Sequence, residues 1–309
     1  MAEYAVIDIG TFSVLLLLAK AESPDRIDPL HEEYEIARLG EDVARTGRLS
    51  EAATLRTLEK LDQYRKTIDQ HSVEAVYVVA SDALRRAANS GTFVQTIKDR
   101  FGWEVHIVSA EEEARLSYLG TTSGFSDLKE TCCVIDVGGG STEISVGQSK
   151  NLLDWKSVPT GAVRLFEQGG KKETLCSGER LELVQFVKLL LENAGIKTLL
   201  SDVEQYIACG GTATTLAAVK KRLAIYKPGA VNGLALSRDE IWQMYFRLND
   251  LTPAQRRALP GMESGRETVV LYGVLIILTL MEWLRIGHIR VSDRGLRYGF
   301  LADKLLKRG

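Results

Sequence analysis

The chain has 309 residues, 45% of them apolar and 26% charged, which is the balance of an ordinary globular protein and a length that suggests about two domains. Its 39 basic and 41 acidic side chains give a net charge of −2, which excludes a generally basic nucleic-acid coat and an acidic disordered tail. The 27 glycines against 6 prolines indicate close backbone approaches inside folded units rather than a low-complexity linker.

The first predicted element is a β-hairpin. An apolar strand ends around Asp8, a turn follows over 10–13, and a second apolar run covers 14–19. We then expect helices over 50–70, with Ser50 as the N-cap, 91–101 and 111–120, and strands over 75–80 and 104–108. A polar stretch, 121–130, is suited to a domain boundary.

The same hairpin pattern returns after this stretch. An apolar run ends in Asp136, three glycines and Ser141 form the turn, and an alternating run begins at Glu143. We then expect helices over 178–195, 212–223, 237–249, 267–284 and 297–307, strands over 206–208 and 289–292, and a Pro/Gly loop over 226–236. Alternating strands and helices predict two homologous α/β domains, 1–120 and 121–296, with the closing helix 297–309 packing back on the first.

The second turn is the most informative segment. Gly138, Gly139, Gly140 and Ser141 let the backbone approach a ligand closely and aim N–H groups at an anion. Because Asp136 beside a phosphate would be repulsive, a bound Mg²⁺ is expected between them. The alternative is a tight hairpin turn in which Asp136 bonds its own loop.

A third glycine site follows a predicted strand. Gly210, Gly211 and Thr212 begin a helix, whose free N–H groups and positive dipole end attract anions. The alternative here is an ordinary Thr N-cap. For the turn over 292–295, capping and packing are favoured over catalysis.

The helix predicted over 111–120 begins with three glutamates. Ser109 and Glu112 have the spacing of a capping box, and Glu111 can pair with Arg115. Glu113 is left as a free carboxylate that can orient and deprotonate an attacking water. Arg85, after another predicted strand, can neutralise a phosphate.

Metal-site and membrane signals are weak. The four cysteines form no CxxC pair and the four histidines no ligand pattern, so a zinc site or a disulfide framework is not expected. The longest apolar run, 269–281, is too short to span a bilayer. We expect a cytoplasmic protein without nucleic-acid or membrane partners, and a homodimer is left open.

With these residues assembled, the chain resembles the exopolyphosphatase / guanosine pentaphosphate phosphohydrolase (Ppx/GppA) family, in its short two-domain form. The matching segments run nearly end to end: Asp8–Gly10, Arg38–Glu41, Glu112–Leu116, Asp136–Glu143, Gly210–Ala213 and Ser292–Arg297. The resemblance implies an α/β fold of two actin-like (ribonuclease H-like) domains flanking an interdomain cleft.

By the same resemblance, Glu113 matches the family's catalytic base. Asp136 and Glu143 match the acidic residues near a metal, Mg²⁺ or Mn²⁺. The phosphate-binding residues implied by the turns and the resemblance are Asp8, Gly10, Thr11, Ser13, Arg85, Gly138, Gly139, Gly140, Ser141, Gly210, Gly211 and Thr212.

The first loop departs from the family pattern. Thr11 and Phe12 stand where Ser and Asn are usual, Leu15 where a basic residue is usual, and Asp82 adds negative charge before Arg85. The leading hypothesis is hydrolysis of the terminal phosphoanhydride of polyphosphate or guanosine pentaphosphate. The alternatives are a non-catalytic sensor that binds an alarmone or polyphosphate, and an ATP-using kinase of the same fold group. Preference between the two substrates is left open.

Overall fold

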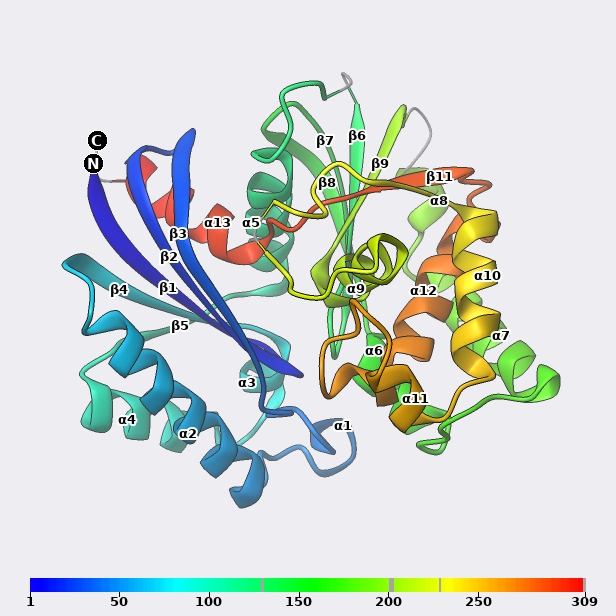
Figure 1. Ribbon diagram of the computed structural model, residues 1–309, viewed down its shortest axis with the longest axis horizontal. Helices are drawn as coiled ribbons and strands as arrows, with labels where there is room; N and C mark the ends of the chain where they lie inside the picture. Colours follow the sequence, from blue (N-terminus) through cyan, green and yellow to red (C-terminus); the bar gives the residue numbers. More distant parts are fainter. Residues whose placement is uncertain (129–130, 200–202, 228, 308–309) are drawn as a thin grey trace. The chain divides into compact units, whose positions relative to one another are not determined.

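The computed structural model describes residues 1–128, 131–199, 203–227 and 229–307. The chain divides into two compact units, unit 1 with Met1–Gly120 and Leu296–Gly309, and unit 2 with Thr121–Gly295 (Figure 1). Parts of three predicted segments, at 129–130, 228 and 308–309, lie outside the described residues.

Unit 1 is built on a mixed sheet with the order β3-β2-β1-β4-β5. Its strands are β1 (Ala2–Ile9), β2 (Ser13–Ser23), β3 (Arg26–Ile36), β4 (Val73–Ala80) and β5 (Val105–Ile107). β1, β2 and β3 form an antiparallel meander, whereas β1, β4 and β5 run parallel. The predicted first hairpin is therefore confirmed, with Asp8 directly opposite Leu15.

Helices cover both faces of the unit 1 sheet. They are α1 (Val43–Thr46), α2 (Glu51–Ile68), α3 (Asp82–Arg86), α4 (Ser90–Phe101), α5 (Ala110–Thr122) and α13 (Leu296–Leu306). One apolar core lies under α2 and α4, and a second lies under α5 and α13. As predicted, Ser50 caps α2, since its hydroxyl accepts a hydrogen bond from the Ala53 N–H at 3.2 Å.

Unit 2 repeats this topology with one strand added, in the order β10-β11-β9-β6-β7-β8. Its strands are β6 (Cys132–Val137), β7 (Thr142–Gln148), β8 (Asn151–Val158), β9 (Gln205–Cys209), β10 (Ala235–Ser237) and β11 (His288–Val291). The run β8-β7-β6-β9-β11 has the same order and directions as β3-β2-β1-β4-β5. The sequence echo thus reflects a repeated α/β fold, and the predicted actin-like class is confirmed.

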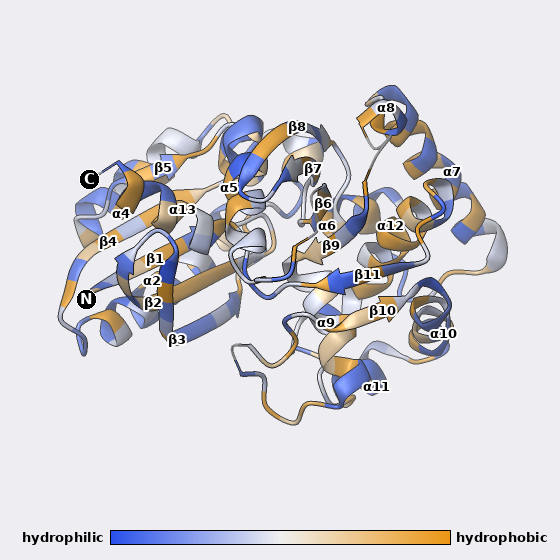
Figure 2. Cartoon of the chain, turned by 90° about the horizontal axis from the view of Figure 1, so that it is seen from above, coloured by the Kyte–Doolittle hydropathy of each residue, from blue (hydrophilic) through white to orange (hydrophobic). Residues whose placement is uncertain are grey.

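The helices of unit 2 surround a single large core. They are α6 (Ala162–Gln168), α7 (Ser177–Asn193), α8 (Ile196–Leu199), α9 (Gly210–Lys221), α10 (Arg238–Asn249), α11 (Pro253–Arg257), the 3₁₀ helix η1 (Arg266–Thr268) and α12 (Val270–Trp283). Hydrophobic residues predominate along α12, which is buried over most of its length (Figure 2). Within the described residues, no helix combines the length and the apolarity needed to cross a membrane.

Three edge strands, β3, β8 and β10, were not predicted, and the predicted Pro/Gly loop over 226–236 is wrong at its end, where β10 begins. Most residues of β3 and β8 are exposed or half-buried, and these two strands carry charged side chains such as Glu32 and Asp154. A strand that pairs on one side only has little apolar pattern to detect. The helix predicted over 267–284 was also wrong at its start, because η1 precedes α12 as a separate turn.

Candidate active site

The two hairpin turns have the same backbone geometry. The Gly10 N–H donates to the Ser13 carbonyl at 2.9 Å, and the Gly138 N–H donates to the Ser141 carbonyl at 3.0 Å. A Cβ at Gly10 would lie 3.2 Å from the Ser13 carbonyl oxygen, and one at Gly138 would lie 3.1 Å from that of Ser141. Both turns are therefore tight enough to favour glycine at their first position.

In each turn, the carbonyl groups are occupied by a following segment of the same unit. In unit 1 the Phe12 carbonyl accepts from the Arg38 N–H at 2.8 Å and the Thr11 carbonyl from the Gly40 N–H at 2.8 Å. In unit 2 the carbonyls of Gly138 and Gly139 accept from the first N–H groups of α6 at 2.9–3.1 Å.

The amide groups of the second turn behave differently from its carbonyls. No backbone carbonyl in the described part of the chain accepts from the N–H groups of Gly139 or Gly140. Successive N–H groups in a glycine turn form a concave site for an anion. This geometry is the one expected of a phosphate-binding turn.

Asp136 and Glu143 lie side by side at the second turn. They are directly opposite each other on β6 and β7, and Cys209 is the neighbour of Asp136 on β9, so the three side chains share a face. Glu143 is buried, and its Oε1 accepts from the Ser157 hydroxyl at 2.8 Å. Burial and then the nearby Asp136 charge raise the pKa of the Cys209 thiol well above its usual value. The thiol therefore stays protonated beside Asp136.

Gly210 allows the close approach of Asp136 to β9. It has a φ of 80°, and a Cβ there would lie 2.8 Å from Asp136 Oδ1. A left-handed backbone in contact with a carboxylate leaves room only for glycine. Close packing against Asp136 thus explains the glycine at position 210, and its predicted phosphate role stays a prediction.

The residues after Gly210 face the interior of unit 2. A Cβ on Gly211 would overlap the Arg266 guanidinium, at 1.9–2.1 Å, and a Cβ on Gly273 would lie 2.2 Å from Thr212 Oγ1. The helix α9 begins at Gly210 rather than at the predicted Thr212, so the Thr N-cap alternative is wrong. The phosphate roles of Gly211 and Thr212 stay predictions.

In unit 1, Arg85 and Glu113 form an ion pair. Arg85 Nη1 donates at 2.9 Å both to Glu113 Oε2 and to the Val108 carbonyl. Glu113 is buried, with 8% of its surface exposed. The prediction that Glu113 has a free carboxylate is therefore wrong, because this carboxylate already forms an ion pair with Arg85.

Topology brings this pair to the edge of the sheet that carries Asp8. Asp8 lies near the carboxyl end of β1, α3 with Arg85 follows β4, and Val108 follows β5. These three strands are parallel neighbours. Ligands of α/β sheets bind at the carboxyl ends of such strands.

Other expectations for the first helical turn of α5 are corrected. The Glu112 N–H donates to the Ser109 hydroxyl at 3.1 Å, so Ser109 caps the helix, but the Glu112 carboxylate pairs with His106 at 2.9 Å. Arg115 binds Asp303 at 2.8 Å and not the expected Glu111. These partners come from β5 and α13, which local spacing does not reveal.

The departures from the family pattern in the first loop have partners of their own. Phe12 is buried, with the Arg38 guanidinium 5.8 Å from its ring centroid. The methyl group of Thr11 would clash with a Cβ at Gly40, at 2.3 Å. Asp82 lies 3.7 Å from Arg85 and 3.8 Å from Arg86. The charge of Asp82 is thus offset by both arginines.

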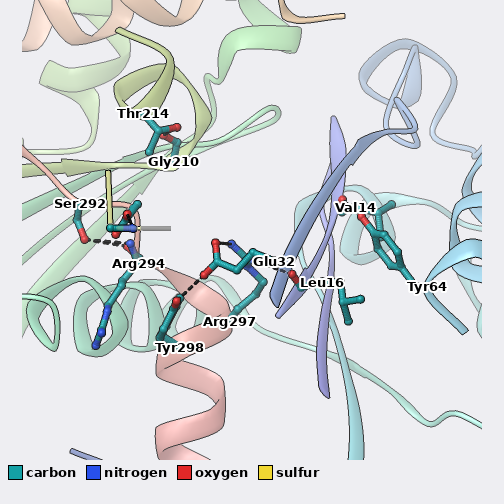
Figure 3. A network of polar contacts seen from close by, with 12 residues as sticks. Val14, Leu16, Glu32, Tyr64, Gly210, Thr214, Ser292, Arg294, Arg297 and Tyr298 are labelled. Carbon is teal, nitrogen blue, oxygen red and sulfur yellow. Dashed lines mark hydrogen bonds and ion pairs between the residues drawn. The ribbon is translucent and has the colours of Figure 1, made fainter. Parts of the chain in front are cut away.

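The turn after β11 is closed by Ser292, and its predicted capping role for α13, which begins at Leu296, stays a prediction. The Ser292 hydroxyl accepts from the Arg294 N–H at 3.2 Å and donates to the Arg294 carbonyl at 3.1 Å (Figure 3). Sequence reasoning missed the roles of Cys209, which lies beside Asp136, and of Arg297, which contacts Leu16 and Glu32. No spacing rule signals them, since the strand pairing and the packing of α13 create these contacts.

The model of the Ppx/GppA phosphatase family matches residues 18–308. The chain belongs to this family. Exopolyphosphatase 2 of Mycobacterium tuberculosis is 29% identical over 311 residues, covering 97% of each chain. The bifunctional 3-dehydroquinate synthase/phosphatase of Fusobacterium nucleatum is also 29% identical, but the match covers 97% of this chain and only 46% of that protein.

A third relative and two solved structures complete the picture of the family. The guanosine-5'-triphosphate,3'-diphosphate pyrophosphatase of Photobacterium profundum is 27% identical over 98% of this chain and 59% of its own. The crystal structure of the Aquifex aeolicus family member has a TM-score of 0.82 and 32% identity, covering 100% of this chain and 99% of that chain. The crystal structure of an exopolyphosphatase-like protein has a TM-score of 0.91 and 26% identity, covering 98% and 97%. The predicted family is thereby confirmed.

Proposed function

We propose that the protein hydrolyses the terminal phosphoanhydride bond of inorganic polyphosphate or guanosine pentaphosphate. Its family is that of the Ppx/GppA phosphatases, and curated relatives are named for activity on these two kinds of substrate. The observation that carries the proposal is the Arg85–Glu113 pair. It lies at the edge of the sheet where β1, which bears Asp8, and its parallel neighbours end. The predicted cleft between the domains and the cytoplasmic location stay predictions.

The proposed chemistry uses Glu113 as the base. An incoming phosphate competes with Glu113 for the Arg85 guanidinium, which binds phosphate oxygens well. The released carboxylate then accepts a proton from a water whose oxygen attacks the terminal phosphorus. The new P–O bond forms as the bridging P–O bond breaks, and the substrate leaves one phosphate shorter. In the second turn, the N–H groups of Gly139 and Gly140 bind phosphate oxygens.

Asp136 and Glu143 are the residues that would hold a divalent metal. Within the described ranges, no group of three or more His, Cys, Asp or Glu could form a complete protein site. Two facing carboxylates nevertheless fit Mg²⁺, which usually takes one or two carboxylates and completes its shell with waters and substrate phosphates. When bound, the ion neutralises phosphate charge.

The decisive experiment measures phosphate release from polyphosphate and guanosine pentaphosphate by wild type and Glu113→Gln. We expect the substitution to lower kcat by about 10²–10⁴-fold, the usual contribution of a general base. Glu112→Gln is the matched control, because this neighbour is bound to His106 at 2.9 Å, and it should stay within about twofold of wild type. Equal rates for wild type and Glu113→Gln would exclude the assigned base.

A second candidate is a non-catalytic sensor for polyphosphate or a guanosine alarmone. The observation that favours it is the buried Phe12 at the first turn, where a polar side chain is usual in the family. Calorimetric binding of either ligand, with no phosphate released in Mg²⁺ or Mn²⁺, would select this function over hydrolysis.

A further inference from the structure

Arg297 is a buried cation at the start of α13. Its Nη1 donates to the Leu16 carbonyl at 2.7 Å, and its Nη2 lies 3.6 Å from Glu32 Oε2 (Figure 3). The neighbouring Tyr298 hydroxyl also donates to Glu32. These bonds fix the guanidinium over β2 and β3 of unit 1.

The face of the sheet beneath α13 is the one that carries Asp8. Tyr4 and Val6 of β1 belong to the core packed under α13, and side chains alternate along a strand, so Asp8 lies on the same face. The register sets Val6 opposite Leu17, and Leu17 opposite Glu32. Glu32 therefore lies in the row of side chains next to that of Asp8 and two strands away, and Arg297 contacts both Glu32 and the Leu16 carbonyl of the intervening β2.

The electrostatics of Arg297 agree with this placement. Burial, the largest single influence, lowers the pKa of its guanidinium, but the nearby Glu32, Tyr298, Asp8 and Tyr64 together raise it by more. The balance leaves the pKa of Arg297 above its ordinary value. Asp8 is thus close enough for the two charges to stabilise each other.

The two turns differ in what faces their aspartates. Across the second hairpin Asp136 faces the carboxylate of Glu143, whereas across the first hairpin Asp8 faces the apolar Leu15. The hairpin itself supplies no positive charge opposite Asp8. A carboxylate at a phosphate turn repels its ligand unless a cation offsets it.

We propose that Arg297 is a positioning residue that orients the Asp8 carboxylate and offsets its charge, so that the first turn accepts a phosphate anion. The proposal rests on the proposed function, since it concerns the same substrate phosphates. A purely structural role would instead limit Arg297 to joining α13 to the hairpin through Glu32 and Leu16. The two roles differ in whether Arg297 and Asp8 are coupled in binding.

The test is calorimetric binding of inorganic tripolyphosphate in the Glu113→Gln background, in which hydrolysis is expected to be about 10²–10⁴-fold slower. Glu32→Gln removes the charge of the structural partner and should leave Kd within about twofold. Adding Arg297→Met to Glu32→Gln avoids an unpaired buried Glu32 and should weaken binding about tenfold, equivalent to about 1.4 kcal/mol. With Asp8→Asn also present, the effect of Arg297→Met should fall below about twofold.

Three results would overturn the proposal. The first is a loss of tripolyphosphate affinity from Arg297→Met that is equally large with Asp8 and with Asp8→Asn. The second is no loss of affinity from Arg297→Met. The third is no binding of tripolyphosphate by the Glu113→Gln parent. If Arg297→Met does not fold, Arg297→Lys replaces it, and a tenfold loss despite the retained charge overturns the proposal. Thermal unfolding of each variant separates stability from binding. Absence of phosphate release by wild type would contradict only the proposed function, because the binding measurement that tests Arg297 needs no turnover.

Discussion

The Glu113 carboxylate on α5 binds the Arg85 guanidinium on α3 at 2.9 Å, and these helices follow the parallel strands β5 and β4. The pair joins the predicted base to the predicted phosphate ligand before any substrate is present. Because one charge neutralises the other, substrate phosphate has to displace the carboxylate from Arg85. The pair therefore couples binding of the anion to release of the base.

This coupling predicts the behaviour of Arg85→Gln. Loss of the guanidinium should raise KM for polyphosphate about tenfold or more and lower kcat, since both phosphate binding and the orientation of Glu113 depend on it. The matched control is Arg86→Gln, whose native side chain lies 3.8 Å from Asp82. Steady-state phosphate release checks both, and similar kinetics for the two variants would contradict the role of Arg85.

Gly210→Ala tests the packing of β9 against Asp136. A left-handed residue at φ 80° with a Cβ 2.8 Å from Asp136 Oδ1 should cost about 1–3 kcal/mol of unfolding free energy. The rate of phosphate release should also fall, because the Asp136 carboxylate must move away from the new Cβ. Urea unfolding measures the cost, and Gly287→Ala, where a Cβ meets nothing within 4 Å, should stay within about 0.5 kcal/mol of wild type.

Gly299→Ala tests the contact between α13 and α5, the helix that carries Glu113. A Cβ at Gly299 would lie 1.9 Å from the Leu116 carbonyl oxygen, so the helices must separate. We expect a loss of about 1–3 kcal/mol and a lower kcat. Gly178→Ala in α7 meets nothing within 4 Å and should stabilise by up to about 1 kcal/mol. Urea unfolding measures both changes in unfolding free energy, and changes of the same sign in the two variants would contradict this packing.

Asp303 predicts a pH dependence of stability. Burial raises the pKa of its carboxyl, but the bonds to Lys307 and Arg115, at 2.7 and 2.8 Å, outweigh burial and lower it. A folded pKa below the unfolded value of about 3.9 means that the contribution is complete above pH 4 and lost as pH falls through the folded pKa. Wild type should thus exceed Asp303→Asn in unfolding free energy at pH 6, and the difference should shrink towards pH 2. Chemical unfolding across that range checks the sign, which a constant difference would contradict.

The sequence by itself determined the repeat. Strands that end in Asp8 and Asp136, each followed by a glycine turn, required only local periodicity and turn chemistry, and both predicted hairpins form. The edge strands β3 and β8 were not predicted, because a strand that pairs on one side only has a weak pattern of apolar residues.

Only the tertiary structure decided the partners of the candidate site residues. Glu113 looked free because Arg85 lies far from it in sequence, and the alignment of parallel strands joins them. Arg297 looked like part of a closing helix because its neighbours, Leu16 and Glu32, are near the other end of the chain. Local pattern encodes backbone geometry, whereas the charge balance of a site depends on side chains that the chain brings together only when it folds.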